Sequence, residues 1–254
     1  MVIEYFSRAC GLFKGLLHLI LINIILSFLN FSEIIRVITF RGIHFGLKIT
    51  FPTSIHVLWD FVSTPLTKSI YTGGFIGIIL SITTLLLSAL LAGGYIGVIL
   101  RELNLKKPMK FIEYSVRYFP HILVYEVLIY ALSLLLSFSL FISSVIFIST
   151  IFLFFILIYF IYATPFIIVI KDLSMINALR ESMYLATKKS YIIYTLLYVS
   201  ITLVISIPIT LITVNLNILG IIIGSIIASI PSLILTIATT LMVIDISKYT
   251  ITTN

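Results

Sequence analysis

The chain contains two long stretches without a charged side chain. No Asp, Glu, Lys, Arg or His occurs from Val127 to Ile170 or from Ser190 to Ile244. About 20 consecutive apolar residues make a helix that crosses the hydrocarbon core of a membrane. Each stretch is more than twice that length, so each predicts two membrane-spanning helices joined by a tight turn.

The other apolar segments extend this pattern to an all-α, polytopic transmembrane bundle of about six spans, with residues 1–254 as one domain. No small-residue cleavage site follows the first apolar segment, so we expect a retained anchor rather than a signal peptide. The predicted spans are 15–31, 73–100, 119–138, 143–170, 191–213 and 216–244, and 32–72 is the large external segment.

Composition supports a membrane protein and predicts its orientation. The chain is 61% hydrophobic and 10% charged, whereas a soluble domain carries about 25% charged residues. Twelve of the 16 Lys and Arg residues lie in the two terminal segments and in the connectors 101–118 and 171–190. Basic residues favour the cytoplasmic side, so we expect both termini inside, in a multi-pass protein of the cell membrane. The same rule accounts for the net charge of +7.

Both basic connectors are predicted to form amphipathic helices. Pro108 suits the start of the first, and Ser174 is the predicted N-cap of the second. Such helices lie in the membrane interface; ordinary solvated connectors are the alternative. The predicted apolar faces are Met109, Ile112, Val116 and Phe119 in the first connector and Ile176, Leu179, Met183 and Ala186 in the second.

The external segment carries a strand-like pattern. Polar and apolar residues alternate from His44 to Phe51, which predicts a small hairpin. Trp59, with prolines nearby, favours the alternative of a segment that rests on the lipid headgroups.

Small residues predict which helices pack closely, because membrane helices associate where their backbones approach. The sixth span has a small residue at every fourth position. The second span has glycine clusters at both ends, which predicts a central helix with different neighbours in each leaflet. The residues concerned are Gly220, Gly224, Ala228, Ser232, Thr236 and Thr240 in the sixth span, and Gly73, Gly77, Gly93 and Gly97 in the second.

Two prolines lie inside predicted spans, Pro208 in the fifth and Pro231 in the sixth. Both are predicted to kink their helices, which frees carbonyl groups that Ser or Thr must satisfy. Broken helices often mark the binding site of a transporter; a kink without function is the alternative.

A few polar groups fall within predicted spans, and an intramembrane ionisable residue is a functional candidate. Glu126 and His121 lie on the third span, and His18 and Asn23 on the first. Both helices start at the cytoplasmic side, so we expect these four residues in the inner leaflet, with Glu126 near Asn23 or His18. The group would form a polar vestibule or proton-sensitive gate, or alternatively a satisfied contact between helices.

Motifs of enzymes are absent from the sequence. It contains no GxxxxGK[ST], HExxH or GxSxG pattern. The four histidines fall on both predicted sides of the membrane, and Cys10 is the single cysteine. We therefore expect no enzymatic activity, no cofactor and no metal site.

One part of the chain resembles a known group of proteins. The run Ala163–Ser174 (ATPFIIVIKDLS), followed by 178–182 (ALRES) and 188–191 (KKSY), together with Gly93-Gly94, resembles a broad group of poorly characterised six-helix membrane proteins. That group includes the membrane domain of some glycerophosphodiester phosphodiesterases. The resemblance implies the membrane architecture and not the phosphodiester chemistry. In size, span count and archaeal style of composition, the chain also resembles the polytopic subunit of the crenarchaeal DNA-import system.

These observations favour a non-enzymatic channel or scaffold subunit of a membrane transport assembly, with DNA import as the most concrete form. The expected partners are membrane lipids, other membrane subunits, a cytoplasmic ATPase, nucleic acid and further copies of the chain. The alternative is a small-solute or lipid transporter that acts alone at Pro208 and Pro231. An intramembrane enzyme would rest on Glu126 alone.

Overall fold

The computed structural model describes residues 2–29, 74–105 and 109–251. The predicted external hairpin, Trp59, Gly73 and Pro108 lie outside the described residues. The surroundings of Gly77 are likewise not described.

The described residues form helices and short turns, and none of them forms a strand, which confirms the all-α class. The helices are α1 (Val2–Leu12), the 3-10 helix η1 (Phe13–Leu19), α2 (Ile20–Leu29), α6 (Gly74–Glu102), α7 (Phe111–Ile142), α8 (Ser144–Ile161), α9 (Thr164–Lys171), α10 (Met175–Ala186), α11 (Lys189–Asn215) and α12 (Asn217–Ile251).

Five stretches are long and apolar enough to cross a membrane, which indicates a multi-pass membrane protein. They are Val2–Ile25, Ile82–Glu102, Phe111–Leu136, Val145–Lys171 and Ile222–Ser247. The predicted fifth span, 191–213, coincides with α11, which is not among these five stretches of the described chain.

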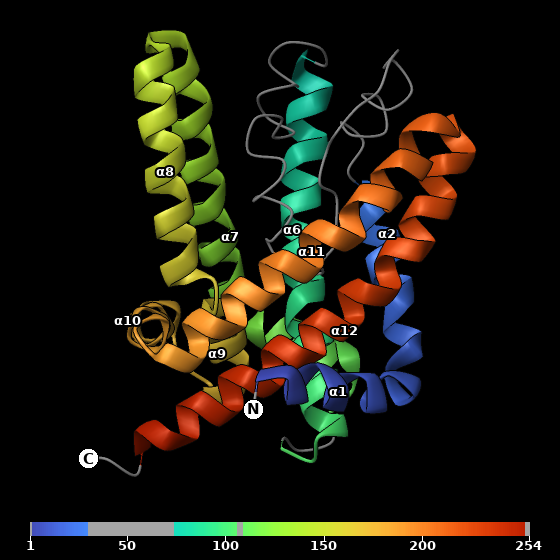
Figure 1. The fold of residues 1–254 in the computed structure, drawn as a ribbon, viewed down its shortest axis with the longest axis vertical. Coiled ribbons are helices and arrows are strands. Elements are labelled where there is room, and N and C mark those ends of the chain that lie inside the picture. Colours follow the sequence, from blue (N-terminus) through green and yellow to red (C-terminus); the bar gives the residue numbers. More distant parts are fainter. Residues whose placement is uncertain (1, 30–73, 106–108, 252–254) are drawn as a thin grey trace.

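Two helical hairpins, α7–α8 and α11–α12, extend toward the same end of the molecule (Figure 1). Ser143 forms the first turn, and its hydroxyl accepts hydrogen bonds from the backbone N–H groups of Val145 (3.2 Å) and Ile146 (3.3 Å), which caps α8. Leu216 forms the second turn. Both termini lie at the opposite end, together with α9 and α10 (Figure 1).

Two short helices lie across this terminal end rather than along the bundle. Figure 1 shows α1 at a steep angle to α2, and α10 seen end-on beside the lower part of α8. The interfacial helices expected from the sequence were the two connectors, and only the second of them, α10, is a separate helix.

The prediction for the first connector was wrong, because α7 starts at Phe111 and continues without a break into the third span. Two residues of the predicted apolar face lie on the outside, with Ile112 72% exposed and Val116 62% exposed. The buried face carries Tyr114 and Tyr118 instead. Ile and Val are as stable against lipid as against protein. The residues that face the neighbouring helix are therefore those whose shape fits it.

Glycines on α6 create the space for that tyrosine face. A Cβ atom at Gly97 would lie 2.3 Å from Cγ of Tyr114, and one at Gly94 would lie 2.3 Å from Oγ of Ser115. A Cβ at Gly93 would lie 3.1 Å from Cβ of Tyr118. The α6 backbone therefore packs directly against α7, and any larger residue would push the helices apart.

The fourth span, predicted at 143–170, corresponds to the apolar stretch Val145–Lys171, within which the helix divides into α8 and α9 at Tyr162–Ala163. Pro165 lies in the first turn of α9. Proline is tolerated there because backbone N–H groups in the first turn have no carbonyl partner within the helix. By contrast, Pro208 and Pro231 lie within the continuous helices α11 and α12.

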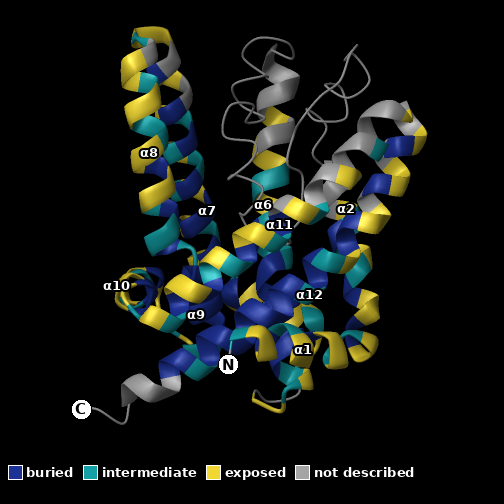
Figure 2. Cartoon of the chain, viewed as in Figure 1, coloured by how far each residue is buried: buried dark blue, intermediate teal, exposed yellow. Residues whose placement is uncertain are grey.

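The stripe of small residues on α12 lies on its protein-facing side. All six members, Gly220, Gly224, Ala228, Ser232, Thr236 and Thr240, are buried. The helix packs on α11, α1 and α2, and Figure 2 shows it mostly buried where it crosses the bundle. The outer side of α8 is exposed by contrast (Figure 2).

Candidate functional site

Of the four intramembrane polar residues predicted to meet, Asn23 and Glu126 are buried. Asn23 is fully buried and donates from Nδ2 to the hydroxyl of Tyr95 (3.1 Å) and to the carbonyl oxygen of Ser229 (3.2 Å). His18 and His121 are exposed. Asn23 therefore joins helices α2, α6 and α12.

This contact continues through a second hydroxyl. Tyr95 is fully buried on α6 and interacts with both Asn23 and Thr236 of α12. The Thr236 hydroxyl in turn donates to the carbonyl oxygen of Ser232, at 2.8 Å. Buried polar groups in a membrane are costly unless they are bonded to one another, so this network fixes how the three helices meet.

Glu126 lies on α7 and is buried, at 7% exposed. The hydroxyl of Ser88 on α6 is next to its carboxyl group. Both residues lie on the same pair of helices that the glycines of α6 bring together, so the carboxyl group belongs to the α6–α7 contact.

The structure reveals a tyrosine cluster that the sequence analysis missed. It consists of Tyr159 and Tyr162 at the end of α8 and Tyr191, Tyr194 and Tyr198 on α11. Ring centroids are 5.4 Å apart for Tyr159 and Tyr191, 5.9 Å for Tyr162 and Tyr198, and 6.0 Å for Tyr194 and Tyr198. The signal was available: Tyr191, Tyr194 and Tyr198 repeat at three- and four-residue spacing, which puts them on one face of a helix.

Hydroxyl groups of the tyrosine cluster bond to several helices. Tyr191 donates to the carbonyl oxygen of Tyr159 (3.2 Å), and Tyr159 donates to that of Ala186 at the end of α10 (2.6 Å). The hydroxyl of Tyr194 lies 2.8 Å from that of Thr239 on α12. These bonds join α8, α10, α11 and α12 at one place.

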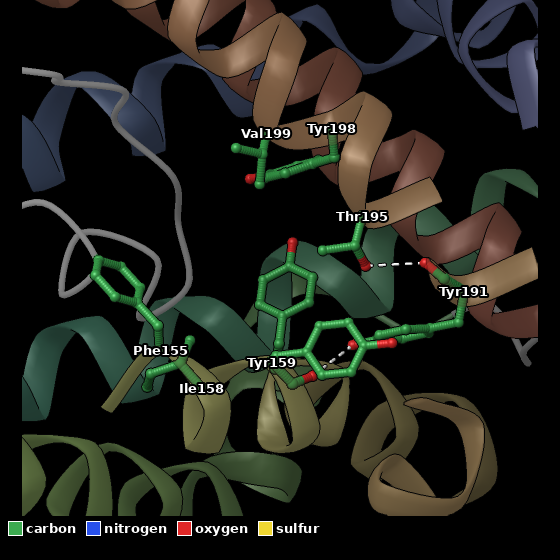
Figure 3. A pocket seen from close by; sticks show the side chains of 8 residues that line it. Phe155, Ile158, Tyr159, Tyr191, Thr195, Tyr198 and Val199 are labelled. Carbon is green, nitrogen blue, oxygen red and sulfur yellow. Dashed lines mark hydrogen bonds between the residues drawn. The ribbon is translucent and has the colours of Figure 1, made fainter. Parts of the chain in front are cut away.

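A groove opens beside the tyrosine cluster, between α8 and α11 (Figure 3). Its volume is about 160 Å³. Phe155, Ile158 and Tyr159 project from α8, and Thr195, Tyr198 and Val199 project from α11, while the rings of Tyr159 and Tyr191 come together at one end (Figure 3). Eight residues line it: Phe155, Ile158, Tyr159, Tyr162, Tyr191, Thr195, Tyr198 and Val199.

A second group of charged residues lies near the ends of α7, α9 and α10 and pairs across these elements. Arg117 of α7 lies 3.1 Å from Asp172, and the Tyr118 hydroxyl donates to the same carboxylate. Asp172 ends α9 with φ of 54°, a left-handed conformation that Asp tolerates. Lys171 pairs with Glu181 of α10. These contacts tie α7, α9 and α10 together.

Among the residues that the structure describes, no group of three or more His, Cys, Asp or Glu side chains could hold a metal ion. No family model, curated protein or solved structure matches this chain. The site is therefore interpreted from its own geometry.

Proposed function

We propose that the protein is a non-enzymatic channel or scaffold subunit of a membrane transport assembly, which binds its partners through α10. The observation that carries this proposal is a short helix, fixed across the ends of the spans, whose outer face exposes apolar residues and Arg180. The polar contacts of the tyrosine cluster and of Asn23 act between helices, which suits a framework more than a reaction site.

The inner face of α10 is held firmly. Ser182 donates to the carbonyl oxygen of Phe160 at 2.7 Å, and Glu181 pairs with Lys171. Ala178 and Ser182 are fully buried, and small residues of this kind let α10 approach α8 closely. A partner would therefore meet a preorganised surface, which lowers the entropic cost of association.

The outer face of α10 has the composition of an interface. Met183 is 48% exposed and Tyr184 46% exposed, and Arg180 is exposed beside them. Met, aromatic residues and Arg are enriched in protein interfaces relative to the rest of the surface. Ile176, 64% exposed, extends this face.

The proposal includes six spans with both termini in the cytoplasm of a cell-membrane protein. Supporting it, α11 has 27 residues, enough for about 40 Å of helix, and it forms a hairpin with α12. The termini lie at the end that carries the basic connectors (Figure 1). Cys10, the single cysteine, is exposed on α1 at this end. An impermeant maleimide should label Cys10 in inverted vesicles and leave it unlabelled in intact cells; the opposite result refutes this orientation.

The partner surface is tested by purification from native membranes with three versions of the chain. Wild type should retain a defined set of membrane subunits or an ATPase, and Arg180→Glu with Met183→Glu should lose them. Lys110→Glu reverses an exposed charge at the same end of the molecule and should retain them. A functional chain that purifies alone, or equal retention by all three versions, refutes the proposal.

DNA is the cargo we propose for the assembly. Basic residues outnumber acidic ones at the terminal end, where a polyanion would meet them. Cells that lack the chain should lose uptake of labelled DNA and regain it on expression of wild type. Unchanged uptake refutes DNA as the cargo without refuting the scaffold role.

A further inference from the structure

The groove between α8 and α11 offers a ligand mainly apolar surface, because several hydroxyl groups that line it are bonded to the backbone. The Tyr159 and Tyr191 hydroxyls already donate to backbone carbonyls, and the hydroxyl of Thr195 donates to the carbonyl oxygen of Tyr191 at 2.9 Å. What remains for a ligand is aromatic and aliphatic surface, which selects a hydrocarbon over a polar solute.

The groove is exposed at Phe155 and Val199 and closed at Tyr191. Phe155 is 39% exposed and Val199 38% exposed, whereas Tyr191 is fully buried at the inner end. Tyr191 and Val199 are eight residues apart, which makes the groove about 12 Å long on α11. An apolar cavity of roughly 150 Å³ binds a benzene-sized hydrocarbon, so a volume of about 160 Å³ suits part of a lipid chain.

Positive charge lies at the inner end of the groove. Lys188 is the N-cap residue of α11, three residues before Tyr191, and its carbonyl oxygen accepts hydrogen bonds from the backbone N–H groups of Tyr191 (3.0 Å) and Ile192 (3.2 Å). Its ammonium group lies 4.2 Å from the centre of the Tyr184 ring and donates to the Tyr184 hydroxyl at 2.6 Å, which holds it in place. Lys189 is exposed next to it, while the neighbouring carboxylate of Glu181 is paired with Lys171.

We propose that this groove binds a hydrocarbon chain of an anionic membrane lipid, with the phosphate of its headgroup on Lys188 and Lys189. The chain lies against Phe155, Tyr198 and Val199, and the headgroup lies where α10 meets α11. Tyrosine and lysine side chains are typical anchors at the headgroup level of a membrane. The proposal concerns a lipid site and stands whether or not α10 binds a protein partner.

The test uses the full chain in a mild non-ionic detergent, with native mass spectrometry as the measurement. Dioleoyl phosphatidylglycerol and dioleoyl phosphatidylcholine are added at equal concentration. The two lipids have identical hydrocarbon chains and differ in the headgroup, which leaves the first with a net negative charge and the second with none. Wild type should retain phosphatidylglycerol about tenfold better than phosphatidylcholine, a difference of about 1.4 kcal/mol.

Two variants test separately the binding of the lipid's hydrocarbon chain and the binding of its headgroup. Val199→Phe fills the open side of the groove and should reduce retention of both lipids at least fivefold. Lys188→Gln with Lys189→Gln leaves the groove intact and should abolish the preference for phosphatidylglycerol while phosphatidylcholine still binds. Val204→Phe makes the same change on the same helix at a residue 71% exposed, and it should behave as wild type.

Three results would overturn the proposal. The first is unchanged retention in Val199→Phe, and the second is a headgroup preference that survives loss of both lysines. The third is a stable dimer whose cross-links run through Val199, which would make a second copy the occupant. Because the lysine variant changes only the surface, it decides the headgroup claim even if Val199→Phe does not fold.

Discussion

Replacing Gly97 by Ala should separate α6 from α7. The new Cβ would lie 2.3 Å from Cγ, 2.6 Å from Cδ1 and 2.7 Å from Cβ of Tyr114. These atoms are at the root of a fully buried side chain and cannot swing aside as the end of a long side chain could. Overpacking of this kind destabilises a protein by about 1–3 kcal/mol, and we expect Gly97→Ala to lower the free energy of unfolding by that amount.

The measurement is denaturant unfolding in detergent micelles, followed by circular dichroism, with a matched glycine as the control. A Cβ at Gly11 meets nothing within 4 Å, so Gly11→Ala on α1 should raise the free energy of unfolding by up to about 1 kcal/mol. In a background of Tyr114→Gly, which removes the Cβ atom as well as the ring, Gly97→Ala should lose most of its effect, with a coupling energy of about 1–3 kcal/mol.

Equal stability of Gly97→Ala and wild type would refute this account of the α6–α7 contact. So would a destabilisation that persists unchanged without the Tyr114 side chain, since the clash would then not be its cause.

Three further perturbations test the polar contacts. Asn23→Leu removes the donor to Tyr95 and should lower the free energy of unfolding by about 1–2 kcal/mol; an unchanged value would show that the three-helix network contributes nothing. A double-mutant cycle of Arg117→Gln and Asp172→Asn should give a coupling energy below about 1 kcal/mol, as for other partly exposed ion pairs, and a value above 2 kcal/mol would contradict it. Glu126→Gln should change the free energy of unfolding by less than about 1 kcal/mol and leave partner retention intact, because the amide can still bond beside α6; lost retention would instead support a gate.

The extent of several helices could be predicted because charge marks the ends of apolar runs. The prediction 73–100 corresponds to α6 at Gly74–Glu102, and the chain turns at Ser143 and Leu216 where the two uncharged stretches were expected to fold back. A helix must reach across the hydrocarbon core, so apolar runs indicate where the spans lie, although the helices differ in length from 18 residues in α8 to 35 in α12.

The faces of the helices were harder to predict, and α7 shows the physical reason. In water, Ile112 and Val116 would mark the buried side of a helix, but in a membrane such residues are equally stable against lipid. The protein-facing side is set by complementary shape, here Tyr114 against Gly97. Apolar spacing on α7 therefore does not identify the side that packs against the protein, and Tyr114 and Tyr118 were not predicted to lie on it.

The polar contacts could not be predicted for a different reason. Asn23 and Tyr95 are 72 residues apart, and Asn23 and Ser229 are 206 apart, so no local pattern links them. The expectation that Asn23 would meet Glu126 followed from equal depth in the membrane, which does not specify which helices are neighbours. The tyrosine spacing on α11 was the one local signal of the groove.

The most direct test of the central claim is site-specific photo-crosslinking in native membranes. A photoreactive residue at position 183, on the outer face of α10, should form an adduct with one defined subunit, and Arg180→Glu should abolish that adduct. The same probe at position 204 of α11 should form no such adduct, although Val204 is 71% exposed and Met183 48% exposed. Identical adducts at both positions, or adducts only with lipid at position 183, would contradict the assignment of α10 as the partner surface.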